Sequence, residues 1–513
     1  MRLPASALAL LALAAGLAAA PVAAQDLPFP HVRAFLDSLD TLGAIADEAE
    51  REAAFDALWD DLRAAEQIPF ALGDSAVVLY RGSYSSPAAV AGDHNGWNPG
   101  AGSMSRVGLS RVWHRVYAFP PAARIDYKLV VGGSWILDPE NPHQQWSGFG
   151  PNSELRMPAW VFPEETVRDP DAPRGAFTSN QVIESTRLGY PVHYRVYTPA
   201  GYDDLSDLPV LYVTDGHEYS DDRLGAALIV LDNLIHDGRA APALAVFVDP
   251  REVGNPSNNR RAEQYVQNPD FAAFLAEELV PAIDAAYRTR TDRDGRVILG
   301  TSLGGVFSTY LGLQHPDVFG RLAIQSPAFW VSEDPDWWTG PSLFELVDAA
   351  PEGLFTIYMS TGTINDGEGN ARRMRDLFEA HDHDLTYHEV PEGHSWGNWR
   401  ALIDEVLMAL LPGTAVSTEP VPESDTGLRL DSFPNPAVGG TTLRFRLPAP
   451  SAVSLSCYDA RGRRTAALAD GVPLPAGQHQ RALPAEALAA GRYHCRLDTA
   501  TGSVTHTVTL TAR

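Results

Sequence analysis

The spacing of apolar residues changes along the chain, and each change predicts a different kind of structure. Residues 31–67 place Phe35, Leu39, Phe55 and other apolar side chains at helical spacing, which predicts one or two amphipathic helices. From about residue 76 to 158, short alternating runs are separated by Gly, Asn, Asp and Pro. This texture is typical of the strands and turns of a small β-sandwich.

Residues 178–411 alternate between apolar strand-like runs and helical patterns. The clearest helix is expected at 271–287, and the strand-like runs lie at 194–199, 210–214, 243–248, 297–299, 321–325 and 355–359. This alternation predicts an α/β fold with a doubly wound, mainly parallel sheet.

The composition of the two ends sets the remaining boundaries. Residues 1–24 hold one arginine, a Leu/Ala run and small residues before Gln25, as in a cleaved secretory signal. No later apolar run is long enough to span a bilayer, so we expect a soluble, exported protein. The predicted organisation is a signal peptide (1–24), a helical segment (25–70), a β-sandwich (71–160), an α/β domain (175–412), a Pro/Thr/Glu/Ser-rich linker (413–431) and a second β domain (432–513).

The charge balance limits the possible partners. The chain has 65 Asp and Glu against 39 Lys and Arg, a formal net charge of −26, so nucleic acid is excluded as an expected partner. Lys128 is the single lysine, and every other basic side chain except histidine is arginine. Cys457 and Cys495 are the only cysteines. In an exported protein they form either one disulfide or two buried thiols.

The stretch Gly300-Thr301-Ser302-Leu303-Gly304 contains the strongest chemical signal. It follows an apolar strand and opens into a helical pattern, the arrangement of a nucleophile elbow that raises a serine hydroxyl above a sheet. A Cβ at position 300 or 304 would collide with neighbouring backbone or side chains, which explains both glycines. We therefore predict Ser302 as the nucleophile.

A serine nucleophile needs a histidine base and a carboxylate to orient it, in the chain order serine, acid, histidine. His394 follows an extended run and a turn late in the domain, whereas His381, His383 and His388 lie in helix-end or strand patterns. The acid is expected in the loop after the strand at 355–360. Both Asp366 and Glu368 qualify by position, and Asp366, with its shorter side chain, is preferred.

Two backbone amides are expected to form the oxyanion hole. Leu303, directly after the serine, supplies one, and Gly216 or His217, after the strand at 210–214, supplies the other. The ring of His217 is an alternative contact for the substrate. Trp330 lies in a loop that either lines the cleft or caps it. The sequence indicates no metal site and no cofactor.

The α/β segment resembles the esterase D-type family, which includes enterochelin esterase-like enzymes and the feruloyl and acetyl esterases of carbohydrate esterase family 1. The resemblance implies Ser302 as nucleophile, His394 as base and an acid within 361–368. Thr363 stands where many members carry an acidic residue, which leaves the identity of the acid open. The motifs that carry it are Leu211-Tyr212-Val213-Thr214-Asp215-Gly216, residues 300–305, residues 315–320, residues 325–330 and Pro391-Glu392-Gly393-His394-Ser395-Trp396.

The two flanking segments resemble known modules as well. Gly92-Asp93-His94-Asn95-Gly96-Trp97-Asn98-Pro99 and the motifs up to residue 155 are similar to family 48 carbohydrate-binding modules, which implies sugar contacts through Trp97, Trp135 or Trp146, unless these side chains belong to a core. Residues 433–497 look like the C-terminal sorting domain of the type IX secretion system. That resemblance implies the secretion machinery as a partner and a secreted or surface location.

We therefore expect a secreted serine carboxylesterase that hydrolyses feruloyl or acetyl esters, on plant polysaccharide, through an acyl-enzyme. An esterase of the same mechanism acting on a siderophore or another small ester is the first alternative. The second is a non-catalytic glycan-binding surface protein.

Overall fold

The computed structural model describes residues 29–83, 87–413 and, with short gaps, 429–511. The predicted signal peptide and most of the predicted linker lie outside the described residues. The chain divides into two compact units, residues 1–415 and 416–513, and each is described by itself. No helix within the described residues is long and apolar enough to cross a membrane.

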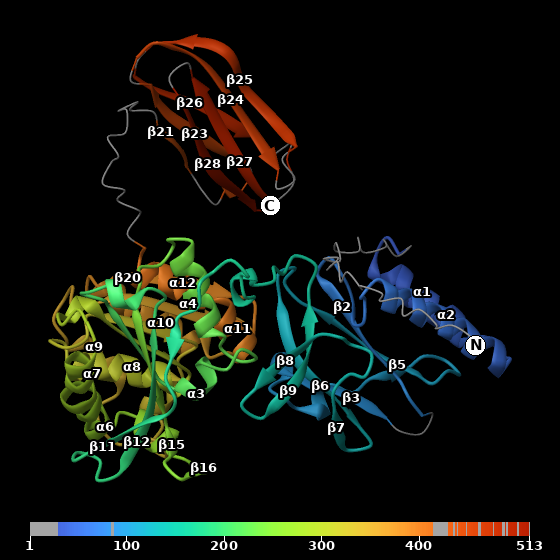
Figure 1. The fold of residues 1–513 in the computed structure, drawn as a ribbon. Coiled ribbons are helices and arrows are strands. Elements are labelled where there is room, and N and C mark those ends of the chain that lie inside the picture. Colours follow the sequence, from blue (N-terminus) through green and yellow to red (C-terminus); the bar gives the residue numbers. More distant parts are fainter. Residues whose placement is uncertain are drawn as a thin grey trace, which may run out of the picture. The chain divides into compact units, whose positions relative to one another are not determined.

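The first unit begins with two helices that pack on a β domain of two sheets (Figure 1). The side chains of His31 and Asp47 cap the helices by accepting bonds from backbone amides of the first turn. The elements are α1 (Val32–Gly43), α2 (Glu48–Ala64), a sheet ordered β1 (Phe70–Leu72), β2 (Ser75–Arg81), β5 (Val112–Ala118), β4 (Ser105–Arg106), and a sheet ordered β3 (Ala88–Gly92), β6 (Arg124–Val131), β9 (Gly150–Arg156), β8 (Gln144–Ser147), with β7 (Ser134–Ile136) paired to β6.

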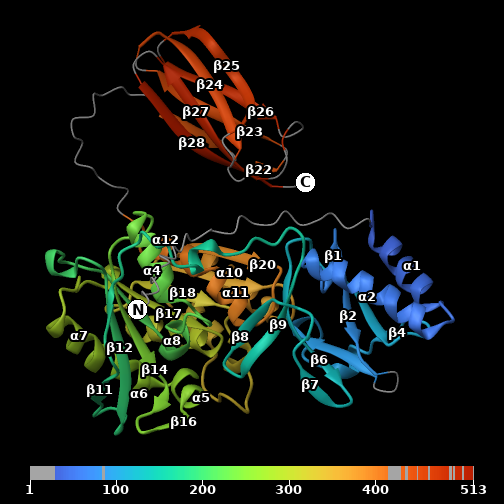
Figure 2. The ribbon, with the colours of Figure 1, turned by 45° about the vertical axis from the view of Figure 1, so that its right-hand side comes forward.

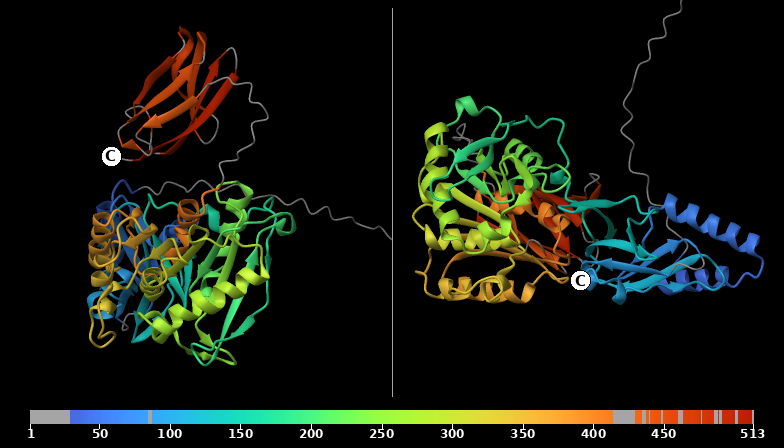
Figure 3. Two further views of the ribbon diagram at one scale, coloured as in Figure 1. Left: turned by 90° about the vertical axis from the view of Figure 1, so that its left-hand side faces the viewer. Right: turned by 90° about the horizontal axis from the view of Figure 1, so that it is seen from below.

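Strand alternation arranges this N-terminal β domain in layers. In β2, Val77 and Leu79 face the helices, whereas Ala76 and Val78 face the second sheet. The blue helices α1 and α2 lie on the side of the domain away from the α/β sheet (Figure 3). The second sheet is therefore the layer nearest to the rest of the unit, and its strand β8 contacts α11 (Trp396–Ala401) (Figure 2).

The α/β domain is built on a nine-stranded sheet whose β14, β13, β17, β18, β19 and β20 are parallel. The doubly wound, mainly parallel arrangement agrees with the predicted one. The strand order is β10 (Ala176–Phe177), β12 (Pro191–Thr198), β14 (Leu244–Asp249), β13 (Val210–Val213), β17 (Arg296–Thr301), β18 (Arg321–Gln325), β19 (Thr356–Gly362), β20 (Asp384–Val390), with β11 (Gln181–Glu184) paired to β12 and a separate hairpin of β15 (Arg251–Glu252) and β16 (Asn255–Asn259).

Helices cover both faces of this sheet and bury a hydrophobic core on each. A helical run over the predicted 271–287 segment consists of α6, a π-helical stretch at Phe274–Leu279 and α7. One face carries α5 (Arg261–Tyr265), α6 (Pro269–Ala273), α7 (Val280–Ala286), α8 (Leu303–Gln314), α9 (Leu343–Asp348) and α10 (Glu368–Ala380), and the other carries α4 (Ala227–His236), α11 and α12 (Ile403–Leu410).

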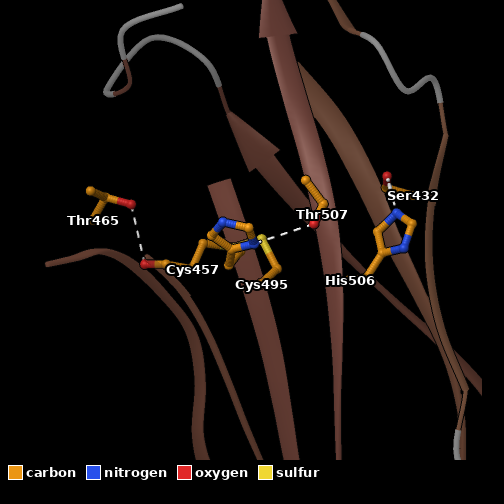
Figure 4. The surroundings of a disulfide bond; sticks show 7 residues. Ser432, Cys457, Thr465, Cys495, His506 and Thr507 are labelled. Atoms are coloured by element: carbon orange, nitrogen blue, oxygen red, sulfur yellow. Dashed lines mark hydrogen bonds between the residues drawn. A yellow bond between two sulfur atoms is a disulfide. The ribbon is translucent and has the colours of Figure 1, made fainter. Parts of the chain in front are cut away.

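The second unit is all-β and has its own core. Cys457 and Cys495 stand opposite each other on β24 and β27 and form a disulfide, which decides between the two expected states (Figure 4). One sheet is ordered β21 (Arg429–Phe433), β23 (Gly440–Leu447), β26 (Gly477–Pro484), and the other β22 (Ala437–Val438), β28 (Gly502–Thr511), β27 (Gly491–Thr499), β24 (Ser451–Asp459), β25 (Arg464–Leu474).

Candidate active site

Ser302 lies in a tight turn between β17 and α8, with φ 58° and ψ −117°. A side chain rarely adopts this backbone conformation, so the surrounding structure must hold it. A Cβ on Gly300 would lie 2.2 Å from the carbonyl oxygen of Gly304, and one on Gly304 would lie 2.5 Å from Thr214 Oγ1. Both glycines are therefore required for the turn that presents the serine.

The structure brings Ser302, His394 and Asp366 together in one hydrogen-bonded chain. Ser302 Oγ lies 2.9 Å from His394 Nε2, and His394 Nδ1 lies 2.5 Å from Asp366 Oδ1. Between the two predicted acids, the structure places Asp366 against the histidine, while Glu368 begins α10.

The Asp366 carboxylate is fully buried and held by several donors. Its Oδ2 accepts from Ser326 Oγ at 2.6 Å, from Thr361 Oγ1 at 3.2 Å and from the amide of Gly362. These donors fix the orientation of the carboxylate, so that its Oδ1 faces His394. The other histidines near this part of the chain are engaged elsewhere: His388 with Glu405, His383 with the Leu354 amide and His381 near Asp348.

The predicted oxyanion residues lie at two helix starts on one edge of the sheet. Leu303 begins α8, and Gly216 begins α3 (Gly216–Tyr219) directly after β13, the parallel neighbour of β17. The first amides of a helix have no acceptor within it, so they are available to a developing oxyanion. The ring of His217 does not line the serine cleft: it lies 3.4 Å from Asp249 in a separate small pocket, where burial lowers its pKa.

A cleft of about 600 Å³ opens over Ser302 and His394. Its walls come from both domains of the first unit: Trp97, Lys128, Trp135 and Phe149 among others from the N-terminal β domain, and Glu218, Asn259, Arg261, Trp396 and Trp399 from the α/β domain. Two of the tryptophans expected to bind substrate, Trp97 and Trp135, thus line the same cleft as the serine.

Trp330 is not among the residues that line this cleft. It packs edge-to-face with Trp337, 5.7 Å between ring centroids, so of its two expected positions, lining the cleft or capping it, the first is not observed. Trp146 lies beneath the Arg223 guanidinium. Within the described residues, Asp169, His236 and Asp237 have the spacing of metal ligands, but they do not line the cleft either.

Arg124 links the N-terminal β domain to the segment that carries the histidine, a role that sequence reasoning missed. Only 1% of its side chain is exposed, and it donates to Asp126 at 2.5 Å, Glu154 at 2.6 Å and Glu392 at 3.2 Å. It also donates to Ser395 Oγ at 3.3 Å. Although burial raises the pKa of Glu154, the guanidinium groups of Arg124 and Arg156 outweigh it and lower the pKa to about 2.

Two further contacts connect the domains beside the triad. Asn365, the residue before the acid, donates from Nδ2 to the backbone oxygen of Asp93 at 2.8 Å. Trp160 donates to Glu392 at 3.1 Å. The segments that carry Asp366 and His394 are therefore both attached to the N-terminal β domain. The sequence signal that could have predicted this link is the alternation of charged and apolar residues along β6, because it indicates that one face of the strand is charged.

Glu218 is a second residue that the sequence reasoning did not single out. Glu218 lines the cleft, and burial, followed by the nearby charge of Asp215, raises its pKa to about 7. Asp215 itself is paired with Arg261 at 2.9 Å. The charge of Glu218 therefore changes near neutral pH.

Comparison with known proteins supports ester hydrolysis. Residues 185–410 match the family described as putative esterase. The chain is 26% identical over 229 residues to an endo-1,4-beta-xylanase/feruloyl esterase of Xylanibacter ruminicola, covering 42% of this chain and 28% of that protein. It is 26% identical over 245 residues to an iron(III) enterobactin esterase of Escherichia coli O6:H1, covering 43% of this chain and 57% of that protein. The chain thus spans less than two thirds of these two curated relatives.

The fold is also similar to that of a solved structure. The enterobactin esterase of Shigella flexneri matches with a TM-score of 0.53 and 20% identity, covering 66% of this chain and 93% of that one. This alignment covers a larger part of the chain than residues 185–410 do, so the likeness in fold extends beyond the α/β domain. Residues 185–410 thus match an esterase family, and the comparisons support a carboxylic ester hydrolase.

Proposed function

We propose that the protein hydrolyses esters through a Ser302–His394–Asp366 triad and an acyl-enzyme. The observation that carries this proposal is the continuous hydrogen-bonded chain from Asp366 Oδ1 through the imidazole to Ser302 Oγ. Asp366 holds the ring so that Nε2 faces the serine, and it stabilises the imidazolium that forms during the reaction.

The reaction proceeds in two steps, acylation of Ser302 and hydrolysis of the acyl-enzyme. Ser302 Oγ attacks the ester carbonyl while its proton passes to His394 Nε2, and the amide of Leu303 together with that of Gly216 or His217 receives the oxyanion. The tetrahedral intermediate collapses as His394 returns the proton to the leaving alkoxide, and the alcohol departs. Water, deprotonated by the same histidine, then attacks the acyl-enzyme, and His394 returns this proton to Ser302 Oγ as the carboxylic acid is released.

We infer that the acyl group is feruloyl or a comparable aromatic group in preference to acetyl. The cleft volume of about 600 Å³ exceeds what an acetyl group fills, and indole rings form much of its wall. The relative from Xylanibacter ruminicola, named as a xylanase and feruloyl esterase, supports an ester on plant polysaccharide. The relative from Escherichia coli, named as an iron(III) enterobactin esterase, favours a small siderophore-type ester as the second candidate.

Purified protein should be assayed on p-nitrophenyl acetate, methyl ferulate, acetylated xylan and a catecholate siderophore. Ser302→Ala should lower kcat/KM by about 10⁴-fold on every ester that is hydrolysed. Equal rates for the two proteins would exclude the serine mechanism. Hydrolysis of the siderophore but not of methyl ferulate would establish the second candidate, a siderophore-type ester.

We further propose that the protein is exported, with residues 1–24 as signal peptide and the second unit as the sorting domain. The disulfide between Cys457 and Cys495 supports this, since such bonds persist in oxidising compartments. Cell fractionation and the N-terminal sequence of the mature protein test it: a chain beginning at Gln25 outside the cytoplasm is expected, and an intact chain beginning at Met1 in the cytoplasm would contradict it.

A further inference from the structure

The outer face of β6 connects the domain link to the substrate cleft. Alternation places Arg124, Asp126 and Lys128 on this face, while Ile125, Tyr127 and Leu129 point into the core of the β domain. Arg124 holds the histidine segment through Glu392. Four residues of strand span about 13 Å, and this distance takes Lys128 past the link and into the cleft above Ser302.

Lys128 has no side-chain partner within the described part of the chain, since neither an ion pair nor a hydrogen bond involves its ammonium group. The other cation that lines the cleft, Arg261, is bound to Asp215 at 2.9 Å and to the carbonyl oxygen of Thr301 at 3.0 Å. Lys128 is therefore the cleft cation that remains free to meet a ligand. It is also the single lysine of a sequence whose other basic chains, apart from histidines, are arginines.

The acidic groups around Lys128 have other partners. Asp126 is bound by Arg124 and by Asn152 at 3.1 Å, and Asp93 accepts from the Trp97 indole at 3.2 Å and from the Asp126 amide at 2.9 Å. Glu218, on the opposite wall, adds a negative charge only above about pH 7.

A flat aromatic surface lies beside this cation. Trp97 and Trp135 are stacked, with ring centroids 6.5 Å apart and planes 26° apart, and 48% of Trp135 is exposed. Trp135 pairs with Val130 across β6 and β7, which places it on the same sheet face as Lys128. Phe149 at the β8–β9 turn is 99% exposed and extends the apolar wall of the cleft.

We propose that Lys128, Trp97 and Trp135 form a substrate subsite for an aromatic group that carries a negative charge, a carboxylate or a phenolate. The ring stacks on the indoles, and the anionic group pairs with the Lys128 ammonium. The subsite deepens the proposed function and rests on it: the N-terminal β domain selects the ester that the triad cleaves.

The test compares methyl cinnamates that differ only at the para position: carboxylate, hydroxyl and methyl. Lys128→Met keeps the chain length and removes the charge, and Lys128→Arg keeps the charge. We expect Lys128→Met to lower the kcat/KM ratio of the carboxylate ester to the methyl ester about 10- to 50-fold, chiefly through KM, and Lys128→Arg to retain the ratio within about threefold. If the phenolate is the ligand, the hydroxyl ester shows this loss only above the pKa of its phenol.

Arg33→Met is the matched control, because Arg33 is an exposed arginine of α1 that is paired with Asp37 and does not line the cleft. It removes one positive charge and should keep the ratio. If Lys128→Met lowers kcat/KM equally for all three esters, or does not lower it at all, the proposed subsite is wrong.

Binding to Ser302→Ala separates this proposal from the catalytic one. Quenching of tryptophan fluorescence should show tighter binding of methyl 4-carboxycinnamate than of methyl 4-methylcinnamate, with the difference lost in Ser302→Ala/Lys128→Met. Selective binding without turnover by the native protein would refute the triad and keep the subsite. Turnover with no charge-selective binding would refute the subsite and keep the triad.

Discussion

Asp366 and Glu368 are two carboxylates of one loop with unequal surroundings, and their substitution should have unequal effects. Asp366→Asn presents an amide to His394 and favours the wrong tautomer, so kcat should fall by about 10⁴-fold. Glu368→Gln, at the start of α10, should change kcat by less than about twofold. Steady-state kinetics on methyl ferulate checks both, and a comparable loss in the two variants would refute the assignment of the acid.

Glu218 predicts a pH effect that does not come from the triad. Its pKa of about 7 makes the cleft more negative as pH rises through neutrality. We expect kcat/KM for a carboxylate ester to fall by about threefold across this range because like charges repel, and Glu218→Gln to remove that fall. The methyl ester is the control. A profile of the carboxylate ester that is identical in both proteins would show that Glu218 does not face the substrate.

The raised pKa of Glu218 also affects the stability of the fold. The folded protein keeps the Glu218 proton up to about pH 7, whereas the unfolded chain releases it near 4.5. Folding therefore binds a proton between these values, and the contribution of this group to stability falls as pH rises through them. Glu218→Gln should flatten that part of the stability profile, as measured by urea unfolding at pH 5 and pH 7.

At the level of single residues, the sequence predicted Ser302, His394 and the acid-bearing loop because their motifs are local, and the structure brings these three segments together. The choice of Asp366 depended on which oxygen reaches the imidazole, a distance set by β18, β19 and the turn after β19. The contacts of Arg124 and Lys128 could not be predicted from the sequence for a related reason. Their contacts depend on which face of β6 meets the α/β domain, whose Glu392 lies 268 residues after Arg124.

Among the elements, β6 is the one whose alteration should affect both folding and chemistry. Arg124→Met leaves the carboxylates of Asp126 and Glu392 buried without their cation and Glu154 with Arg156 alone, so we expect a loss of about 3–5 kcal/mol in the free energy of unfolding. The His394 segment also loses its attachment, which should lower kcat more than it changes KM.

Urea unfolding and steady-state kinetics check this expectation. Arg372→Met, at an exposed pair with Glu389, is the control and should cost less than about 1 kcal/mol. A cost for Arg124→Met as small as that of the control would mean that the buried network does not hold the two domains together.

Helices and strands followed from periodicity, since α1, α2, the parallel strands and the helical run near 271–287 all have regular apolar spacing. Which strands lie together in one sheet could not be predicted from this periodicity. The split of the first β domain into two sheets, and the choice of the sheet that faces the triad, depend on long-range contacts that no local window contains.

For the whole molecule, the two units have separate hydrophobic cores. A chain ending at Ala415 should therefore keep kcat/KM within about twofold and retain the main thermal transition. Calorimetry and ester assays of both proteins check this, and a tenfold loss of activity on truncation would show that the second unit contributes to the site.

The single lysine gives the molecule one further property. An amine-selective reagent finds one side chain in the whole sequence, and that side chain lies inside the cleft. A fluorophore or cross-linker can therefore be attached there in the native protein without engineering, with the α-amino group as the other amine to be blocked, and its emission would report each ligand that enters.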